Sequence, residues 1–209
     1  MPNREAPTGS AAGDGDADRS NGYERIATAF LAGRGGPTSN AIGAARVRAW
    51  ARALPPQAAV LDLGCGSGIP ITQVLLEAQL AVHAVDASPT MIAALRANFP
   101  HIPVACEPAE ESPFFHRSFD GIVAWGLLFL LTPTTQVALL GRIASALHPG
   151  GRLLFTSPAT ACSWIDVLTG EQSRSLGAES YREALARVGF TEISEYDDEG
   201  QNHYYDARR

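Results

Sequence analysis

Short apolar runs alternate with stretches of helical apolar spacing from about residue 58 onward. The runs predict buried strands, and the stretches in which apolar residues recur at i, i+3, i+4 and i+7 predict amphipathic helices. The predicted strands are 59–63, 81–85, 102–106, 119–125, 152–156, 190–196 and 202–207. The predicted helices are 69–79, 89–98, 134–147 and 180–188. This alternation predicts an α/β fold whose mostly parallel sheet is covered by helices on both faces.

The polar segment from Asp197 to Gln201 separates the last two strands and predicts a hairpin turn. The final strand therefore joins the sheet in the antiparallel direction. The segment 157–180 is read as an insert between the fifth strand and the last predicted helix.

The N-terminal part of the chain has two predicted components. Residues 1–21 are rich in Gly, Ala, Asp, Ser and Pro and lack periodic apolar positions, which predicts a disordered tail. A helix is predicted from Tyr23 to Leu31 and a second one over 39–53, with a glycine-rich hinge between them that would let the first act as a lid. We expect residues 22–209 to form a single domain, with a helical cap at 22–57 on a core of 58–207.

The stretch VLDLGCGSG, Val60 to Gly68, joins a predicted strand to a predicted helix through three alternate glycines. Glycine lets the backbone turn tightly and lets a ligand approach the main chain closely. A strand, a glycine turn and a helix open a nucleotide-binding βαβ unit, whose ligand lies at the carboxyl ends of the strands. Asp86 ends the second strand, 22 positions after Gly64, where a carboxylate accepts both hydroxyls of a ribose. A helix-capping Asp ahead of Pro89 is the competing interpretation.

The spacing of the glycines favours a nucleoside without phosphates. A dinucleotide fingerprint has the spacing G-x-G-x-x-G, whereas Gly64, Gly66 and Gly68 give G-x-G-x-G, and Ile69 follows. The turn also lacks the lysine of a P-loop. A nicotinamide-dependent NAD(P) oxidoreductase on the same architecture and a non-catalytic cofactor-binding module remain as alternative functions.

Five stretches together resemble the class I S-adenosylmethionine-dependent methyltransferases of the small-molecule type. They are VLDLGCGSG at 60–68, AVDASPTMI at 84–92, PAEESPF at 108–114, FDGIVAWGLLFLL at 119–131 and LHPGGRLLFTSP at 147–158. The resemblance covers about 58–207 and implies a Rossmann-like seven-stranded sheet of order 3-2-1-4-5-7-6. It also implies S-adenosyl-L-methionine as the cofactor and a small organic molecule as the methyl acceptor.

The resemblance further implies which residues contact each part of the cofactor. Asp62 and Gly64 lie beside the methionine part, and Asp86 takes the ribose hydroxyls. The adenine lies between Ala87 and Leu127, with Ala109 and Glu110 at its edge. The residues assigned to the cofactor in this way are Tyr23, Arg34, Asp62, Gly64, Gly66, Gly68, Asp86, Ala87, Ala109, Glu110 and Leu127. For Arg34, a solvated residue in a glycine-rich loop is an equally good interpretation.

Methyl transfer from a sulfonium is an in-line displacement, so the protein chiefly positions the acceptor atom and excludes water. A neutral amine or a thiolate needs little more, whereas a hydroxyl or a carbon acid needs a base. His203 is the candidate base because its strand begins at the ligand edge, although a hydrogen-bonded surface histidine is the competing interpretation. Aromatic residues near this edge predict a pocket for a small organic acceptor. The candidates for this pocket are Phe30, Trp125, Trp164 and Tyr204.

The net charge of −6 argues against a nucleic acid or an anionic membrane surface as a partner. The longest apolar run, Trp125 to Leu131, is too short for a membrane span, and the N-terminus shows no secretion signal. Cys65, Cys106 and Cys162 have no metal-ligand spacing and read as free thiols in a reducing cytosol. We therefore expect a cytoplasmic monomer or homodimer without a metal.

Overall fold

The computed structural model describes residues 18–33 and 43–209. A seven-stranded sheet lies at its centre, with the strand order β3-β2-β1-β4-β5-β9-β8. Strands β1 to β5 run parallel to one another, and β9 runs antiparallel to both of its neighbours. The strands of this sheet are β1 (Ala59–Leu63), β2 (Ala81–Asp86), β3 (Val104–Cys106), β4 (Phe119–Ala124), β5 (Leu147–Thr156), β8 (Thr191–Asp197) and β9 (His203–Arg208).

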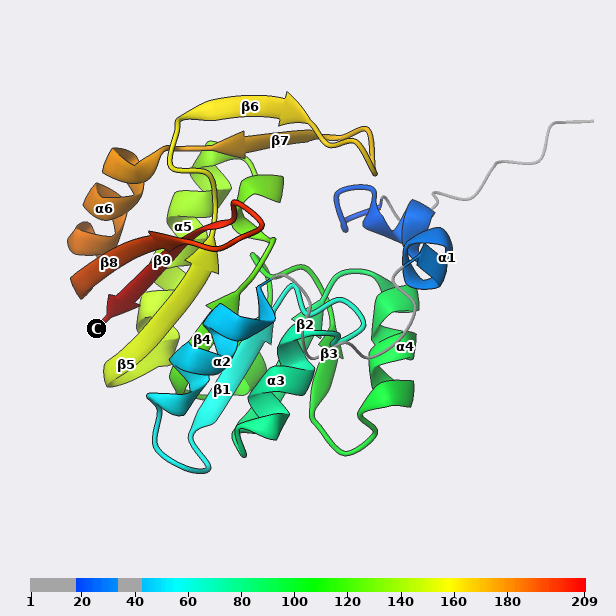
Figure 1. The fold of residues 1–209 in the computed structure, drawn as a ribbon, viewed down its shortest axis with the longest axis horizontal. Coiled ribbons are helices and arrows are strands. Elements are labelled where there is room, and N and C mark those ends of the chain that lie inside the picture. The colour runs from blue at the N-terminus through cyan, green and yellow to red at the C-terminus, as the bar shows by residue number, and fades with distance from the viewer. Residues whose placement is uncertain (1–17, 34–42) are drawn as a thin grey trace, which may run out of the picture.

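Counted along its own strands, the sheet has the order 3-2-1-4-5-7-6, so the predicted order is confirmed. The labels differ because a separate two-stranded hairpin, β6 (Cys162–Ile165) with β7 (Gln172–Ser175), comes before the last two strands. The sequence analysis predicts no strands in the insert 157–180, and this is wrong. The hairpin stands beyond the end of the main sheet (Figure 1), and half-exposed strands of mostly polar residues carry no strong apolar pattern.

Helices cover both faces of the sheet (Figure 1). On β1, Val60 faces the layer of α2 and α3, and Leu61 faces the layer of α5 and α6. Successive residues of a strand point to opposite faces, so a strand buried on both sides reads as a continuous apolar run. The helices are α1 (Tyr23–Gly33), α2 (Ala44–Arg52), α3 (Ile71–Glu77), α4 (Pro89–Asn98), α5 (Pro133–Ala146) and α6 (Ala178–Arg187), with short 3-10 turns η1 (Phe114–His116) and η2 (Leu128–Leu130).

The first helix, α1, stands apart from the sheet and lies beside α4 (Figure 1). Both predicted cap helices are present, the second as α2, and the predicted hinge residues 34–36 lie outside the described residues. Asp18 to Asn21, which the sequence analysis assigns to the tail, lead directly into α1. The buried Ser20 accepts a hydrogen bond from the backbone N–H of Glu24 at 2.7 Å, so the assignment of these four residues to a disordered tail is corrected.

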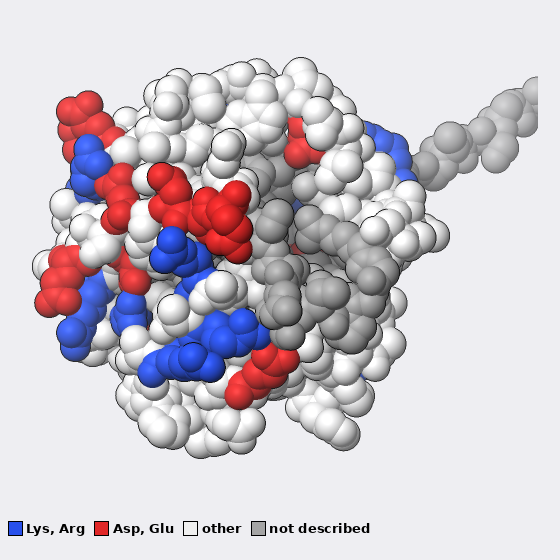
Figure 2. Space-filling model, in the orientation of Figure 1, with Lys and Arg blue, Asp and Glu red and all other residues white. Residues whose placement is uncertain are grey.

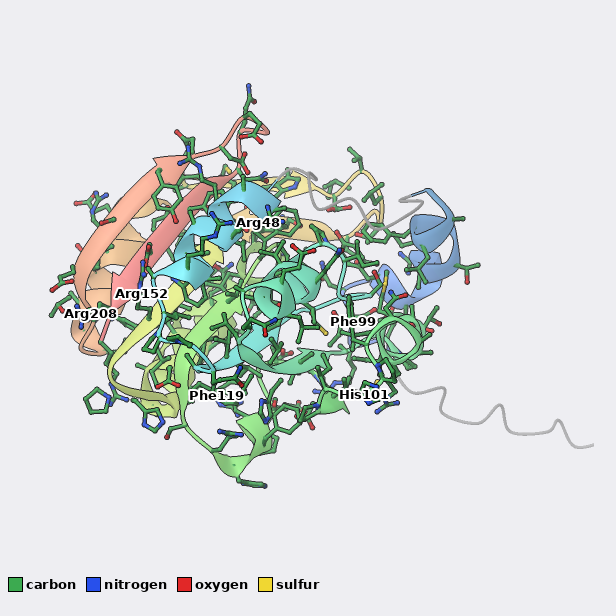
Figure 3. All side chains as sticks on the ribbon, turned by 60° about the horizontal axis from the view of Figure 1, so that its bottom comes forward. Arg48, Phe99, His101, Phe119, Arg152 and Arg208 are labelled. Carbon is green, nitrogen blue, oxygen red and sulfur yellow. The ribbon has the colours of Figure 1, made fainter. Side chains whose placement is uncertain are left out.

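The amino and carboxyl edges of the sheet carry different residues. The amino ends come forward in Figure 3, where Phe119 begins β4 and His101 precedes β3. The carboxyl ends lie on the opposite side, where the glycine turn follows β1 and Asp86 ends β2. Open α/β sheets bind their ligands at the carboxyl ends of their strands, so this edge is where a binding site is expected.

Candidate active site

The turn after β1 depends on its glycines. Gly64, Gly66 and Gly68 all have positive φ angles, of 72°, 54° and 81°, which side chains rarely adopt. The N–H groups of Gly64 and Cys65 both donate to the carbonyl of Val85, which ties the turn to β2. A Cβ on Gly66 would meet nothing within 4 Å, whereas one on Gly68 would lie 2.7 Å from the Phe99 ring. Gly66 therefore borders open space, and Gly68 packs inward against Phe99.

Asp86 links the glycine turn to the end of β2. One carboxylate oxygen accepts from the N–H of Gly66 at 2.8 Å, and the other accepts from the N–H of Ser88 at 2.8 Å. Burial raises the pKa of Asp86, and these backbone hydrogen bonds oppose the rise. A carboxylate has about four acceptor sites, so Asp86 keeps acceptor capacity for two hydroxyls of a ligand in the cleft that it lines.

Asp62 lies one layer deeper than Asp86. It is fully buried, it is not among the residues that line the cleft, and it accepts a hydrogen bond from the hydroxyl of Thr72 at 2.6 Å. Burial, with a smaller contribution from the charge of Asp86, raises the pKa of Asp62 to about 7. The structure thus places Asp62 and Gly68 behind the cleft wall, where they support the turn.

The cleft opens between the glycine turn, the loop after β3, the segment after β4 and α1. Most residues that the sequence analysis assigns to the cofactor meet here, and Arg34 lies outside the described residues. Those that line the cleft are Tyr23, Gly64, Gly66, Asp86, Ala87, Ala109, Glu110 and Leu127. The cleft also receives Arg19, Ser20 and Asn21, which sequence reasoning missed because they carry no periodic pattern. The only signal was Ser20, a residue type typical of a helix N-cap.

Two charged residues hold α1 over the cleft. The Glu24 carboxylate accepts from the backbone N–H and the hydroxyl of Thr90, at 3.1 and 2.6 Å, and from the hydroxyl of Ser88. The neighbouring Arg25 donates to the carbonyl of Thr169, in the turn between β6 and β7, at 2.6 Å. Sequence reasoning did not identify Glu24, because its donors are far away in the chain. These contacts place Tyr23 and Phe30, which form an edge-to-face pair at 5.8 Å, at the mouth of the cleft.

The other half of the cleft is mainly apolar. Trp125 and Phe30, both predicted for the acceptor pocket, line it, together with Phe129, Leu130 and Leu131. Polar side chains here come from Thr156, whose hydroxyl accepts from the N–H of Gly126 at 2.8 Å, and from Asn202. This half therefore favours a ligand with an apolar body and few polar groups.

Trp164 and Tyr204 do not line the cleft, so their assignment to the acceptor pocket is corrected. Trp164 lies in β6 and packs on Phe129 with ring centroids 5.5 Å apart, behind the wall that Phe129 forms. Tyr204 is fully buried, and its hydroxyl accepts a hydrogen bond from the indole N–H of Trp125 at 3.0 Å. Both residues support wall residues from behind.

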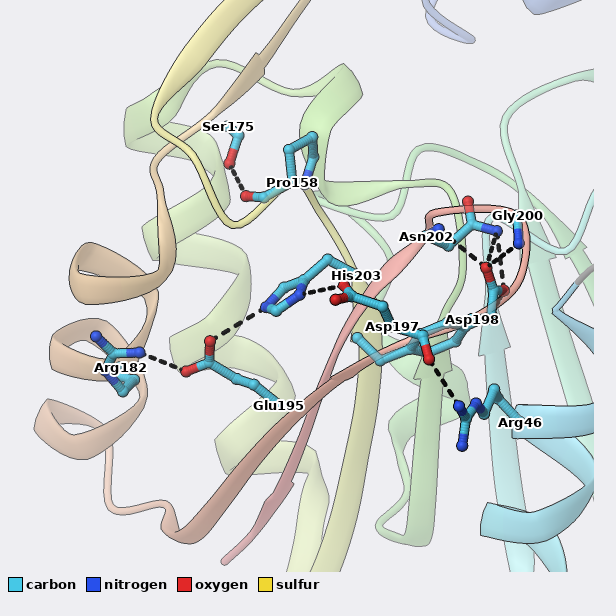
Figure 4. A network of polar contacts seen from close by, with 11 residues as sticks. Arg46, Pro158, Ser175, Arg182, Glu195, Asp197, Asp198, Gly200, Asn202 and His203 are labelled. Atoms are coloured by element: carbon cyan, nitrogen blue, oxygen red, sulfur yellow. Dashed lines mark hydrogen bonds and ion pairs between the residues drawn. The ribbon is translucent and has the colours of Figure 1, made fainter.

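His203 is also corrected, because both of its ring nitrogens already have carboxylate partners. Nδ1 lies 2.7 Å from Asp197 and Nε2 lies 3.1 Å from Glu195, as Figure 4 shows. His203 is not among the residues that line the cleft. The physical reason is the alternation of β9, which turns Tyr204 toward Trp125 and turns His203 toward the opposite face, where its ring packs on Tyr205. The arrangement does not support His203 as the base.

The described part of the chain offers no metal cluster and no spanning helix. No group of three or more His, Cys, Asp or Glu residues within it is arranged to hold a metal ion. None of its helices has the length and apolar character needed to cross a bilayer. On the face drawn in Figure 2, basic side chains lie among acidic ones. Among the described residues, Arg48 forms an ion pair with Glu77, and Arg182 forms one with Glu195.

Comparison with known proteins gives matches over the glycine turn and the parallel strands. Residues 60–151 match the family model described as a methyltransferase domain. An uncharacterized methyltransferase of Mycobacterium tuberculosis is 38% identical over 94 residues, which cover 45% of this chain and 37% of that protein. The chain therefore spans little more than a third of the length of this curated relative.

Solved structures match nearly the whole chain. The 1,6-didemethyltoxoflavin-N1-methyltransferase of Burkholderia thailandensis, crystallised with 1,6-didemethyltoxoflavin and S-adenosylhomocysteine, has a TM-score of 0.67 at 21% identity and covers 99% of this chain and 93% of its own. The [4+2]-cyclase SpnF has a TM-score of 0.71 at 19% identity and covers 92% of this chain and 96% of its own. At these identities the likeness shows a shared fold.

Proposed function

We propose that this chain, whose residues 60–151 match the methyltransferase-domain family model, is an S-adenosylmethionine-dependent methyltransferase acting on a small organic acceptor. The observation that carries this proposal is the pairing of Asp86 with the Gly66 turn beneath a cleft whose other half is apolar. A half-buried carboxylate at the end of β2 suits ribose hydroxyls, and the open space at Gly66 suits close approach of a ligand to the main chain.

The cofactor fits the lining residues without a phosphate-binding element. Asp86 would hold the ribose, Ala87 and Leu127 would enclose the adenine, and Ala109 and Glu110 would meet its edge. Gly64 and Gly66 would approach the methionine part, with Asp62 behind them and Tyr23 above. When bound, S-adenosylmethionine supplies a sulfonium whose methyl group is already activated for displacement. Arg34, which lies outside the described residues, is proposed as a cofactor-binding residue on the sequence resemblance alone.

The residues of this chain position the acceptor and exclude water from it. Trp125, Phe129 and Leu131 would hold an apolar or aromatic body next to the cofactor half of the cleft. None of the described residues on this apolar side is a carboxylate or a histidine with access to the acceptor. We infer an acceptor atom that is nucleophilic without a protein base, such as an amine, a heteroaromatic nitrogen or an ionised phenol.

Calorimetry with S-adenosylhomocysteine, S-adenosylmethionine and NAD tests the cofactor. We expect both sulfur nucleosides to bind and NAD to bind much more weakly, because the third glycine of a dinucleotide site is displaced. The variant Asp86→Ala should lower the affinity for S-adenosylhomocysteine by about 1.5–3 kcal/mol, as for lost hydrogen bonds to a charged group. Preferential binding of NAD, or unchanged affinity in a folded Asp86→Ala protein, would overturn the assignment.

Turnover tests the activity. Small aromatic amines, N-heterocycles, phenols and thiols should be screened for release of S-adenosylhomocysteine from S-adenosylmethionine. The second candidate function is a cofactor-binding protein without methyl transfer, and the observation that favours it is that no described residue on the apolar side of the cleft is placed as a catalytic base. Tight cofactor binding with no turnover across the panel would favour that candidate.

The cellular location, the oligomeric state and the partners of the protein are also matters of proposal. We propose a cytoplasmic monomer or homodimer that does not act on nucleic acid, supported by three free cysteines and by the mixture of acidic and basic side chains in Figure 2. Light scattering after size-exclusion chromatography measures the oligomeric state, and a mobility-shift assay with DNA and RNA tests the exclusion of nucleic acid.

A further inference from the structure

The turn between β8 and β9 is organised by one carboxylate, Asp198. Its Oδ1 accepts from the backbone N–H groups of Gly200 and Asn202, each at 2.9 Å. The side chain is almost completely buried although it lies in a turn between charged and exposed neighbours such as Glu199. A buried carboxylate with this many donors fixes the conformation of its turn.

Asp198 also holds the side chain of Asn202. The Asn202 amide nitrogen lies 3.1 and 3.0 Å from the two carboxylate oxygens. Because an ionised carboxylate only accepts, the amide must present its NH2 group to Asp198, and its carbonyl oxygen then points away, as Figure 4 shows. Asn202 lines the apolar half of the cleft. Its carbonyl is therefore available there as a hydrogen-bond acceptor.

A second arm reaches Trp125 through Tyr204. The Tyr204 hydroxyl donates to Asp198 Oδ2 at 2.8 Å, which leaves its lone pairs to accept from the Trp125 indole N–H at 3.0 Å. The ring of Trp125 is also confined by Gly43, where an added Cβ would lie 2.8 Å from the indole nitrogen. Burial raises the pKa of Asp198, but the hydrogen bonds from Asn202 and Tyr204 outweigh it and hold this pKa below its usual range. The acceptor-only form on which both arms depend is thus the stable one.

We propose that Asp198 is the positioning residue of the acceptor side, setting the carbonyl of Asn202 directly and the indole of Trp125 through Tyr204. This inference rests on the proposed function and deepens it. A wall with one fixed acceptor atom beside a fixed aromatic ring selects a methyl acceptor that carries an N–H or O–H donor on an apolar or aromatic body.

The test is the ¹⁵N–¹H spectrum of the whole protein, in which each tryptophan indole and each asparagine side chain gives its own signals. Trp125→Phe and Asn202→Ala identify the two signals of interest. In Tyr204→Phe, the Trp125 indole proton should shift upfield and exchange faster with water, and the Asn202 amide should keep its position. In Asp198→Asn, both signals should move. Glu199→Gln removes one charge from the same turn and is the matched control, in which neither should move.

Calorimetry with S-adenosylhomocysteine accompanies each spectrum, and its affinity should stay within about twofold, because neither arm reaches the cofactor half. An unchanged Trp125 signal in Tyr204→Phe, or equal changes in Asp198→Asn and Glu199→Gln, would overturn the proposal. If Asp198→Asn fails to fold, Tyr204→Phe still decides the Trp125 arm. Failure of the wild-type protein to bind S-adenosylhomocysteine would refute the proposed function instead and leave the spectral result readable.

Discussion

Removal of the Glu24 carboxylate is the sharpest test of how α1 is held over the cleft. Glu24 accepts three hydrogen bonds, from Ser88 and from two groups of Thr90, at the first turn of α4. A hydrogen bond to a charged group contributes about 1.5–3 kcal/mol, and a carboxylate at a helix N-terminus gains about 0.3–1 kcal/mol. Ser88 is fully buried, so its hydroxyl has no access to water as a substitute.

Glu24 itself is only half-buried, so water can replace the carboxylate at the Thr90 donors. We therefore expect Glu24→Ala to weaken the docking of α1 by about 2 kcal/mol, a factor of about 30 in its local opening equilibrium. Hydrogen exchange measured by mass spectrometry should show this acceleration across Tyr23–Gly33 and no change in α5. Arg25→Ala is the comparison variant: it removes the hydrogen bond to the Thr169 carbonyl and an exposed ion pair with Glu171, which contributes at most about 1 kcal/mol, and it leaves the contacts of α1 with α4 in place.

The pH dependence has a definite direction. Burial raises the pKa of Glu24, but the hydrogen bonds from Ser88 and Thr90 outweigh burial and hold the pKa below its ordinary value of 4.5. A carboxyl group with a lowered folded-state pKa stabilises docking above the unfolded value and loses that contribution as the pH falls through the folded value. Exchange of α1 should therefore accelerate below pH 4.5 in the wild type and not in Glu24→Ala. Equal α1 exchange in the two proteins at neutral pH would refute this account of the helix.

Two further predictions distinguish residues that affect ligand binding in the cleft from residues that affect the stability of the fold. Gly66→Ala should lower the affinity for S-adenosylhomocysteine by about tenfold or more, since its Cβ would enter open space at the cleft, and its positive φ should cost about 1–2 kcal/mol of stability. Gly68→Ala should lower the melting temperature further and the affinity less, since its Cβ would also lie 2.7 Å from Phe99. The pKa of Asp62 is raised from 3.8 to about 7 in the folded protein, so the folded state binds more protons in that window and stability should fall as the pH rises through it, by at most ~1.4 kcal/mol per pH unit. Urea unfolding at several pH values should show this slope flattened in Asp62→Asn, and an unaltered slope would assign it to another group.

The local sequence determined the strands of the sheet and the glycine turn of this protein. Continuous apolar runs such as Val60 to Leu63 specify strands buried on both faces, and the alternate glycines specify a turn with positive φ, because few other residues adopt that conformation. The position of Asp86 at the carboxyl end of the next strand followed from the same pattern. These features depend on residues close together in the chain, and the order of the sheet strands followed from the family resemblance that they carry.

Tertiary structure decided which side chains reach the cleft. The period of two in β9 requires His203 and Tyr204 to face opposite ways, but it does not say which face meets Trp125, and here Tyr204 lies behind that ring. The β6–β7 hairpin has no apolar alternation, so only its pairing in space reveals it. Glu24 accepts hydrogen bonds from Ser88 and Thr90, which lie more than sixty residues away in the sequence. Asp198 is linked to Trp125 through the hydroxyl of Tyr204. Such contacts depend on how helices and strands that are distant in the sequence pack together. Local periodicity predicts which residues share one face of an element, but it does not predict which other element that face will contact.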